Sequence, residues 1–210
     1  MHYEILVEGQ CELTALSILL PKIIGEYNNP HTWKIHKHRG NGSIPDNPAL
    51  APKISDTSLL GQLPAKLRAY SNNPDPNRKV IVLLDLDDKD RESFHTALID
   101  LLKYCSNPFD VSFPFAEEEL EAWYLGDRQA LIAYNAKINM TKLNGYIQDS
   151  ICDTWRFLLE ADEPSLLKLK KKDKRLLEKK VFWAKKITPH MDVDRNLSPS
   201  FNSFKECLHN

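Results

Sequence analysis

Short apolar runs alternate with amphipathic stretches along the first two thirds of the chain. Residues 3–7 form an apolar run that ends at Glu8-Gly9, and the leucine spacing over 13–24 then predicts a helix. Further strands are predicted over 33–38, 79–84 and 111–115, and further helices over 59–70, 91–104 and 117–134. Strands that alternate with helices are typical of an α/β fold with a parallel sheet and right-handed crossovers.

The clearest of these elements is the run Val80-Ile81-Val82-Leu83-Leu84. A strand without polar alternation is buried on both faces, as in a parallel sheet covered by helices. After residue 135 the pattern becomes less regular and mostly helical. We therefore expect an α/β domain over 1–135 and a mostly helical C-terminal extension over 136–210 that packs on it.

Composition places the chain among ordinary globular proteins. It has 210 residues, of which 42% are hydrophobic and 27% charged, and this suffices to bury a core. No apolar run approaches the roughly 20 residues of a membrane-spanning helix, so we expect none. The N-terminus lacks the pattern of a signal peptide, and the four cysteines are scattered without a CxxC pair. These features predict a cytoplasmic protein without a zinc knuckle.

The net charge of −1 conceals an uneven distribution. Residues 1–150 hold 15 basic and 20 acidic residues, whereas residues 151–210 hold 13 and 9. Ten of the basic residues fall within 168–186, interleaved with leucines and aromatic residues in a pattern that predicts an amphipathic helix. Its polar face either contacts solvent or binds the phosphates of a nucleic acid. The candidates for phosphate binding are Lys170, Lys171, Lys174 and Arg175.

Acidic residues follow several of the predicted strands. Glu8 ends the first strand, Asp85 and Asp87 end the most buried one, and Glu119 and Glu121 come shortly after the last. Because ligands of parallel α/β sheets bind at the carboxyl ends of the strands, we expect these carboxylates to converge there. Crowded carboxylates repel unless a cation is present, and hard oxygen ligands select Mg²⁺ or Mn²⁺. The pattern therefore favours metal-assisted phosphoryl transfer.

Several of these residues also have a purely structural interpretation. Asp88 or Asp90 is suited to cap the helix predicted over 91–104. Glu12 is either a partner of Glu8 or an acid favoured at a helix N-terminus. Trp123 is interpreted as a core aromatic residue that fixes the helix presenting Glu121, with base stacking as the alternative.

Two motifs resemble the Toprim domain, the metal-binding catalytic fold of topoisomerases, bacterial primases and OLD-type nucleases. Leu6-Val7-Glu8-Gly9 is similar to its strand-Glu-Gly turn, and Leu83-Leu84-Asp85-Leu86-Asp87 is similar to its buried strand ending in Asp-x-Asp. The resemblance implies a Toprim-like parallel sheet flanked by helices. It also implies that Glu8 is a general acid/base or metal ligand and that Asp85 and Asp87 hold Mg²⁺.

A second resemblance covers nearly the whole chain. The segments Glu119-Leu120-Glu121-Ala122-Trp123-Tyr124-Leu125-Gly126-Asp127 and Asn196-Leu197-Ser198-Pro199-Ser200-Phe201 are similar to signatures of a bacterial Toprim-related family, domain-of-unknown-function family 4276. This resemblance implies that Glu121 is a third acidic group of the site. Members are similar to the nuclease side of Toprim proteins and accompany ATPases in defence-like settings. The extra acid at Asp88 leaves open whether Asp87 or Asp88 completes the metal site.

These interpretations lead to one expected function and two alternatives. We expect an Mg²⁺- or Mn²⁺-dependent phosphodiester hydrolase acting on DNA or RNA, with Glu8 and Glu121 as catalytic residues and Glu8, Asp85 and Asp87 as metal ligands. The family resemblance adds anti-phage defence and an ATPase partner. The alternatives are a non-catalytic module that partners an ATPase and a hydrolase of small phosphate esters.

Overall fold

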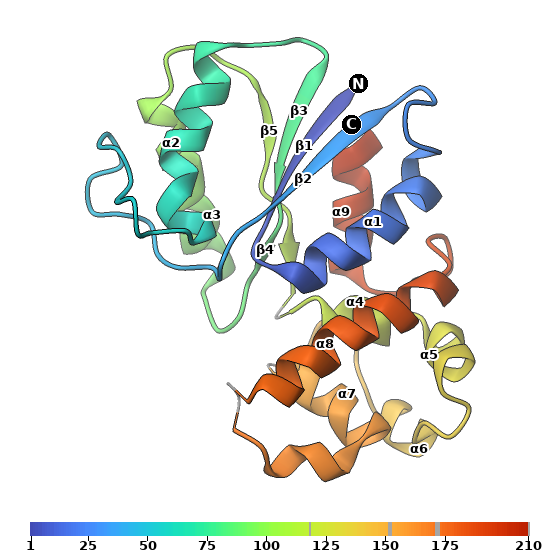
Figure 1. Cartoon of the computed structure of the whole chain (residues 1–210). Helices are drawn as coiled ribbons and strands as arrows, with labels where there is room; N and C mark the ends of the chain where they lie inside the picture. Colours follow the sequence, from blue (N-terminus) through green and yellow to red (C-terminus); the bar gives the residue numbers. More distant parts are fainter. Residues whose placement is uncertain (118, 151–152, 171–172, 210) are drawn as a thin grey trace.

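A parallel β-sheet organises the structure, which is a computed structural model that describes residues 1–117, 119–150, 153–170 and 173–209. The order of the main sheet is β2-β1-β3-β5. Its strands are β1 (His2–Val7), β2 (Thr32–Lys37), β3 (Arg78–Val82) and β5 (Asp110–Ser112). A short parallel pair, β4 (Leu84–Asp85) and β6 (Phe115–Ala116), continues β3 and β5 (Figure 1). Because these pairings are all parallel, the strands end at one common edge.

Alternation along the strands divides the core between two helix layers. Ile5, Val7 and Ile81 face one side of the sheet, which α1 (Gln10–Ile24) and α9 (Pro199–His209) cover. Leu6 and Val82 face the other side, which α2 (Leu59–Asn72) and α3 (Arg91–Asp100) cover. Figure 1 shows the two layers on opposite sides of the strands. This arrangement follows from the two-residue period of a strand, which sends successive side chains to opposite faces.

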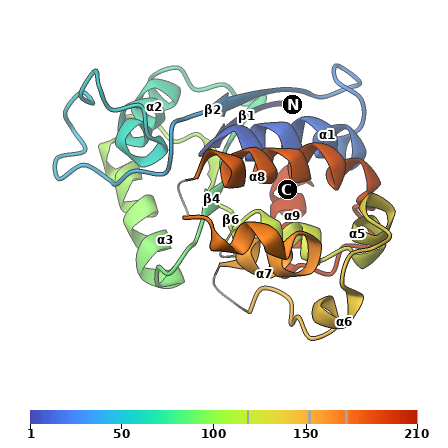
Figure 2. The same ribbon diagram turned by 60° about the horizontal axis from the view of Figure 1, so that its bottom comes forward.

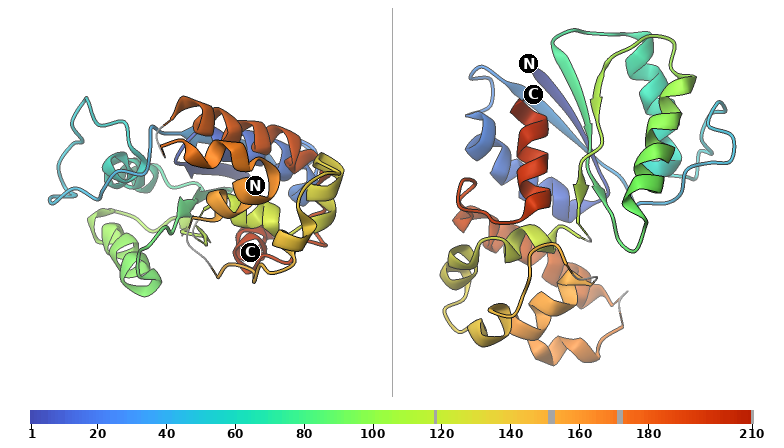
Figure 3. Two further views of the ribbon diagram at one scale, coloured as in Figure 1. Left: turned by 90° about the horizontal axis from the view of Figure 1, so that it is seen from below. Right: turned by 180° about the vertical axis from the view of Figure 1, so that it is seen from behind.

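The remaining helices lie beyond the carboxyl edge of the sheet (Figures 1 and 3). They are α4 (Glu121–Leu125), α5 (Arg128–Tyr134), α6 (Met140–Leu143), α7 (Thr154–Asp162) and α8 (Lys174–Lys186). Short 3-10 segments span Leu101–Tyr104, Pro164–Lys168 and Thr188–His190. Figure 2 shows α8 running alongside α1, with α7 next to it. The chain then returns to the sheet through α9, where the Tyr3 hydroxyl donates to the Leu208 carbonyl at 2.6 Å.

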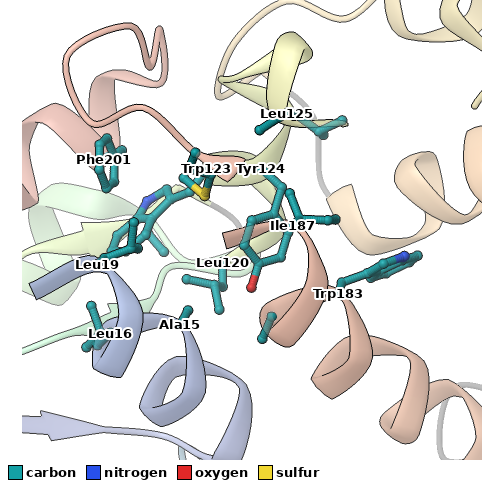
Figure 4. Packing of buried hydrophobic residues seen from close by; sticks show 14 of the residues in the cluster. Ala15, Leu16, Leu19, Leu120, Trp123, Tyr124, Leu125, Trp183, Ile187 and Phe201 are labelled. Carbon is teal, nitrogen blue, oxygen red and sulfur yellow. The ribbon is translucent and has the colours of Figure 1, made fainter. Parts of the chain in front are cut away.

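One hydrophobic cluster joins the sheet side to the helical side. It runs from Tyr3 in β1 to Leu208 in α9 and includes buried residues of α4, α7 and α8. Figure 4 shows its centre, where Trp123 and Tyr124 of α4 pack between α1, α8 and Phe201. The extension expected over 136–210 thus shares its core with the sheet, while a domain boundary at residue 135 stays a prediction.

The predicted α/β architecture is confirmed: the structure has a parallel sheet flanked by helices and a helical C-terminal part. The bounds of several helices and strands differ from the predicted ones. The helix predicted over 117–134 is two helices, because the chain breaks at Gly126-Asp127 and the Asp127 carboxylate caps α5 by accepting from Ala130. The strand predicted over 79–84 is interrupted at Leu83. The helix predicted over 91–104 ends its α-helical part at Asp100.

Candidate functional site

The acidic residues that end the strands meet at the carboxyl edge of the sheet. Glu8 directly follows β1 and Asp85 is the last residue of β4. Burial, reinforced by the charges of Glu12 and Glu8, raises the pKa of Asp85 well above its usual range. Strands β1 and β3 pair in parallel with Leu6 opposite Val82, and the Leu83 amide donates to the Leu6 carbonyl, so the segments that carry Glu8 and Asp85 leave the sheet side by side. The sequence expectation that Glu8 and Asp85 share an edge therefore agrees with the structure.

Glu8 itself is held in a strongly perturbed environment. Burial and then the charges of Glu12 and Asp87 raise its pKa to about 7, against a partial counter-effect of Lys180. Asp87 has a left-handed backbone with φ of 51°, and its carboxylate forms a salt bridge with Lys89 at 3.2 Å. Asp88 is exposed. The sequence left open whether Asp87 or Asp88 completes the metal site. Of these two residues, Asp87 is the one whose charge raises the pKa of Glu8.

Helix α4 and the segment just before it bring two more carboxylates to the same place. Glu121 is 3% exposed, and its pKa is raised to about 7 by burial and by the charges of Glu119 and Glu12, although Lys180 opposes the shift. Glu119, also buried, accepts a backbone hydrogen bond from Trp155 at 3.3 Å. We call the carboxylates that interact here the acid cluster: Glu8, Glu12, Asp85, Asp87, Glu119 and Glu121.

A lysine from the basic helix enters the acid cluster. The Lys180 ammonium lies 3.2 Å from Glu119 Oε1 and 3.5 Å from Glu121 Oε2. Burial disfavours the charged form of Lys180, but the charges of Glu121, Glu119 and Asp85 outweigh that effect and raise its pKa. An ammonium so placed neutralises part of the negative charge that the cluster concentrates.

Glu12 combines the two roles that the sequence left open. Its Oε2 accepts a hydrogen bond from the Gly9 backbone at 2.9 Å, which closes a capping interaction at the start of α1. Its side chain is nearly buried, and burial raises its pKa, with the charge of Glu119 adding to the effect and Lys180 opposing it. Glu12 is therefore both a helix cap and a member of the acid cluster.

The two sequence signatures form the frame that holds Glu121. The fully buried Trp123 donates through Nε1 to Ser200 Oγ at 3.1 Å, and its carbonyl accepts from Asn196 Nδ2 at 2.8 Å. Ser198 caps α9, because its Oγ accepts from the Phe201 backbone at 3.2 Å. The interpretation of Trp123 as a core residue agrees with this packing. Ser198 and Ser200 serve as structural contacts within it.

The basic residues proposed for nucleic acid lie at the start of α8. Lys170 is exposed just before the helix, and the Lys174 side chain is 87% exposed and pairs with Glu178 at 3.4 Å. Arg175 is bound to Asp173, the residue that caps α8, at 2.9 Å. Lys171 lies outside the described residues. The helix predicted over 168–186 begins only at Lys174, because this cap follows a separate 3-10 segment.

The acid cluster has the donor chemistry of a divalent-metal site. Its oxygen donors are those preferred by Mg²⁺ and Mn²⁺, and burial, with the charges of neighbouring carboxylates, raises the pKa of Glu8 and of Glu121. Within the described residues, no three His, Cys, Asp or Glu side chains stand close enough to hold a metal as they are. The type of donor therefore fits such an ion, whereas the positions of the described side chains do not bring three donors to one point.

Comparisons with known proteins place the chain in a family. The family model described as "Domain of unknown function (DUF4276)" matches residues 7–209. The chain belongs to this family. The resemblance carried by the Glu119–Asp127 and Asn196–Phe201 segments is therefore confirmed. No curated protein matches the sequence.

A solved structure is also similar to this DUF4276 chain. It is the C-terminal region of the Burkholderia pseudomallei OLD protein, with a TM-score of 0.49 and 15% sequence identity over 99% of this chain and 96% of that one.

In the described part of the chain, no helix is both long and apolar enough to cross a membrane.

Lys180 is a residue of the site that the sequence did not predict. The sequence placed Lys180 in a basic amphipathic helix, whereas in the structure its ammonium contacts Glu119 and Glu121 of the acid cluster. The available signal was its helical spacing: Lys180 lies four residues after Leu176 and three before Trp183, on the buried stripe. A lysine on an apolar stripe requires a buried partner, and the surplus acids of this DUF4276 chain provide it.

Proposed function

We propose that the acid cluster binds Mg²⁺ or Mn²⁺ and that the protein hydrolyses phosphodiester bonds in DNA or RNA. The observation that supports this most is the group of carboxylates at the carboxyl edge of a parallel sheet, where burial and, after it, the charges of neighbouring carboxylates raise the pKa of Glu8 and of Glu121 to about 7. Burial of unpaired charge destabilises a fold, so such crowding is typical of a site that takes up a cation or a proton.

The roles of individual residues follow from their positions. Glu8, Asp85 and Asp87 would hold the ion, which when bound supplies charge stabilisation for the phosphate oxygens and lowers the pKa of bound water. Glu121 completes the cluster from α4. With a pKa of about 7, Glu8 and Glu121 are suited to take up or release a proton near neutral pH. Lys180 lies where it can neutralise phosphate charge.

The wider setting of the reaction belongs to the same proposal. Lys170, Lys174 and Arg175 extend from the exposed start of α8 and would contact the nucleic-acid backbone. Lys174 precedes Lys180 by six residues, which corresponds to about 9 Å along the helix axis. By family resemblance, the activity would serve defence together with an ATPase partner.

The experiment compares two site variants with a matched control. Purified protein is incubated with duplex DNA and with single-stranded RNA, with Mg²⁺, Mn²⁺ or chelator. Glu8→Gln and Asp85→Asn should abolish metal-dependent cleavage, whereas Asp88→Asn, an exposed acid in the same turn, should retain it. Cleavage by Glu8→Gln and Asp85→Asn at the wild-type rate would show that the reaction does not use this site.

A second candidate function is favoured by Lys180. Because its ammonium already pairs with Glu119 and Glu121, the cluster has an internal counter-ion and can serve as a purely structural element of a non-catalytic module. The cleavage assay together with calorimetric titration with Mn²⁺ separates the candidates. An enzyme binds the ion, cleaves nucleic acid and loses both properties in Asp85→Asn. A non-catalytic module cleaves nothing, even where its carboxylates bind the ion as a structural element.

A further inference from the structure

Helix α8 carries apolar side chains on two opposite faces. Its inner face buries Leu176, Trp183 and Ala184 in the core and presents Lys180 to the acid cluster. Its outer face, which we call the outer stripe, follows a spacing of three and four residues. The outer stripe consists of Lys174, Leu177, Glu178, Val181, Phe182 and Lys185.

The outer stripe exposes large apolar side chains at its centre. Leu177 is 55% exposed and Phe182 is 43% exposed. They lie five residues apart, and Val181 lies one helical turn after Leu177. Together with the other stripe residues they line a shallow hollow of about 480 Å³ along the helix. The three apolar side chains Leu177, Val181 and Phe182 are grouped on one exposed helix face, where a partner can bury them together.

We propose that the outer stripe docks an acidic amphipathic helix of a protein partner. Apolar residues at positions i, i+4 and i+5 with lysines one turn beyond on either side match the spacing by which one helix packs against another. The two ends of the outer stripe are basic, with Lys174 at one end and Lys185 at the other. Arg175 and Lys186 follow them directly in the sequence. Lys174 and Glu178 neutralise each other, so Lys185 and the neighbouring Lys186 leave the rim net positive, which favours an acidic partner.

The same features disfavour a second copy of this chain as the occupant. Two copies of α8 packed antiparallel about a twofold axis would oppose Lys174 of one copy to Lys185 of the other. Lysines in that register repel, and the stripe holds a single acid, Glu178, whose charge is used within its own helix. The charge pattern therefore lacks the self-complementarity that an isologous interface needs.

Nucleic acid is also a poor match for the centre of the stripe. Backbone phosphates are bound by contiguous Lys and Arg side chains and by backbone amides. Leu177, Val181 and Phe182 offer neither, and Glu178 places a negative charge among them. The exposed residues before the helix, such as Lys170, remain free for phosphate while the stripe is occupied.

A docked helix would lie close to the acid cluster without covering it. The stripe and Lys180 project from opposite faces of one helix, whose diameter with side chains is about 10–12 Å. The partner would therefore contact the back of the helix that supplies Lys180.

The test uses designed peptides as probes on the full chain. Two helical peptides of about 20 residues carry leucines at a and d positions. One is flanked by glutamates and the other by lysines. Fluorescence anisotropy should show that the glutamate peptide binds and the lysine peptide does not. Leu177→Glu and Phe182→Glu should weaken binding by about tenfold or more, since such apolar residues act as anchors.

The control variant is Leu197→Glu, because Leu197 is 68% exposed and lies away from the stripe. It should bind the glutamate peptide like the wild type, and circular dichroism should show all three variants folded. Two results would overturn the proposal: no binding of the glutamate peptide, or binding unaffected by Phe182→Glu. A wild-type dimer dissociated by Phe182→Glu would overturn it in favour of self-association.

Discussion

The residues of the acid cluster cannot all be charged without a cation nearby. Lys180 supplies one positive charge at 3.2 Å from Glu119, yet burial and mutual repulsion still raise the pKa of Glu8 and of Glu121 to about 7. The cluster thus holds protons that ordinary carboxyl groups release near pH 4. A bound divalent ion and bound protons compete for the same oxygen atoms, so metal affinity should increase with pH.

The raised pKa of Glu8 predicts how stability depends on pH. Glu8 titrates at about 7 in the folded chain against a usual value of 4.5, so between these pH values the unfolded chain holds fewer protons. Stability therefore falls as pH rises through this window. Glu8→Gln removes the charge and should raise the free energy of unfolding at pH 8, without metal, by about 1–2 kcal/mol, a figure reduced for partial exposure of the side chain.

The measurement is urea unfolding of wild type and variant at pH 4 and pH 8 in chelator. The gain should disappear at pH 4, where Glu8 is protonated in both states. Glu26→Gln, a substitution of an exposed acid just beyond α1, should behave like wild type at both pH values. A Glu8→Gln variant that is less stable than wild type at pH 8 would contradict the predicted charge crowding.

At the scale of elements, the position of α4 depends on the turn that follows it. A Cβ atom on Gly126 would lie 2.1 Å from Asn196 Oδ1 and 2.9 Å from the Ser198 backbone nitrogen. The absence of a side chain lets the segment that begins α9 lie directly against α4. Contacts from Asn196 and Ser200 to Trp123 then fix the helix that carries Glu121.

This close approach predicts the effect of a minimal substitution. Gly126→Ala should destabilise the protein by about 1–3 kcal/mol, because the added methyl group overlaps a buried amide and backbone atoms. Gly145→Ala is the matched control, since a Cβ there has its nearest neighbour at 3.7 Å, an ordinary contact. Thermal unfolding followed by circular dichroism compares the two. Equal melting temperatures for both variants would contradict the packing described at Gly126.

How far the elements could be predicted depends on whether their signals are local. The strands that precede Glu8 and Asp87 were predictable, because a buried parallel strand leaves an apolar run. The close approach of Asn196 to Gly126 was not, since the two residues are distant in the sequence. For Lys180, the helical spacing indicates a buried position, but its acidic partners Glu119, Glu121 and Asp85 come from distant segments.

At the scale of the whole molecule, the helical part and the sheet have one core. Phe204 of α9 packs with ring centroids 5.1 Å from Trp123 of α4, and both belong to the cluster that includes Ile5 of the sheet. The acid cluster is likewise assembled from both parts, with Asp85 from the sheet and Lys180 from α8. The two regions distinguished in the sequence at residue 135 should therefore unfold together.

Urea unfolding tests this expectation with two signals, tryptophan fluorescence and far-ultraviolet circular dichroism. Both should give the same single transition, as for one cooperative unit. Phe204→Ala should lower the free energy of unfolding by about 3–5 kcal/mol, because it leaves a cavity at a fully buried position, and should shift both signals equally. Ile147→Ala, at a side chain 73% exposed, should shift neither. Two separate transitions, of which Phe204→Ala moves only one, would instead show that the sheet and the C-terminal helices are independent domains.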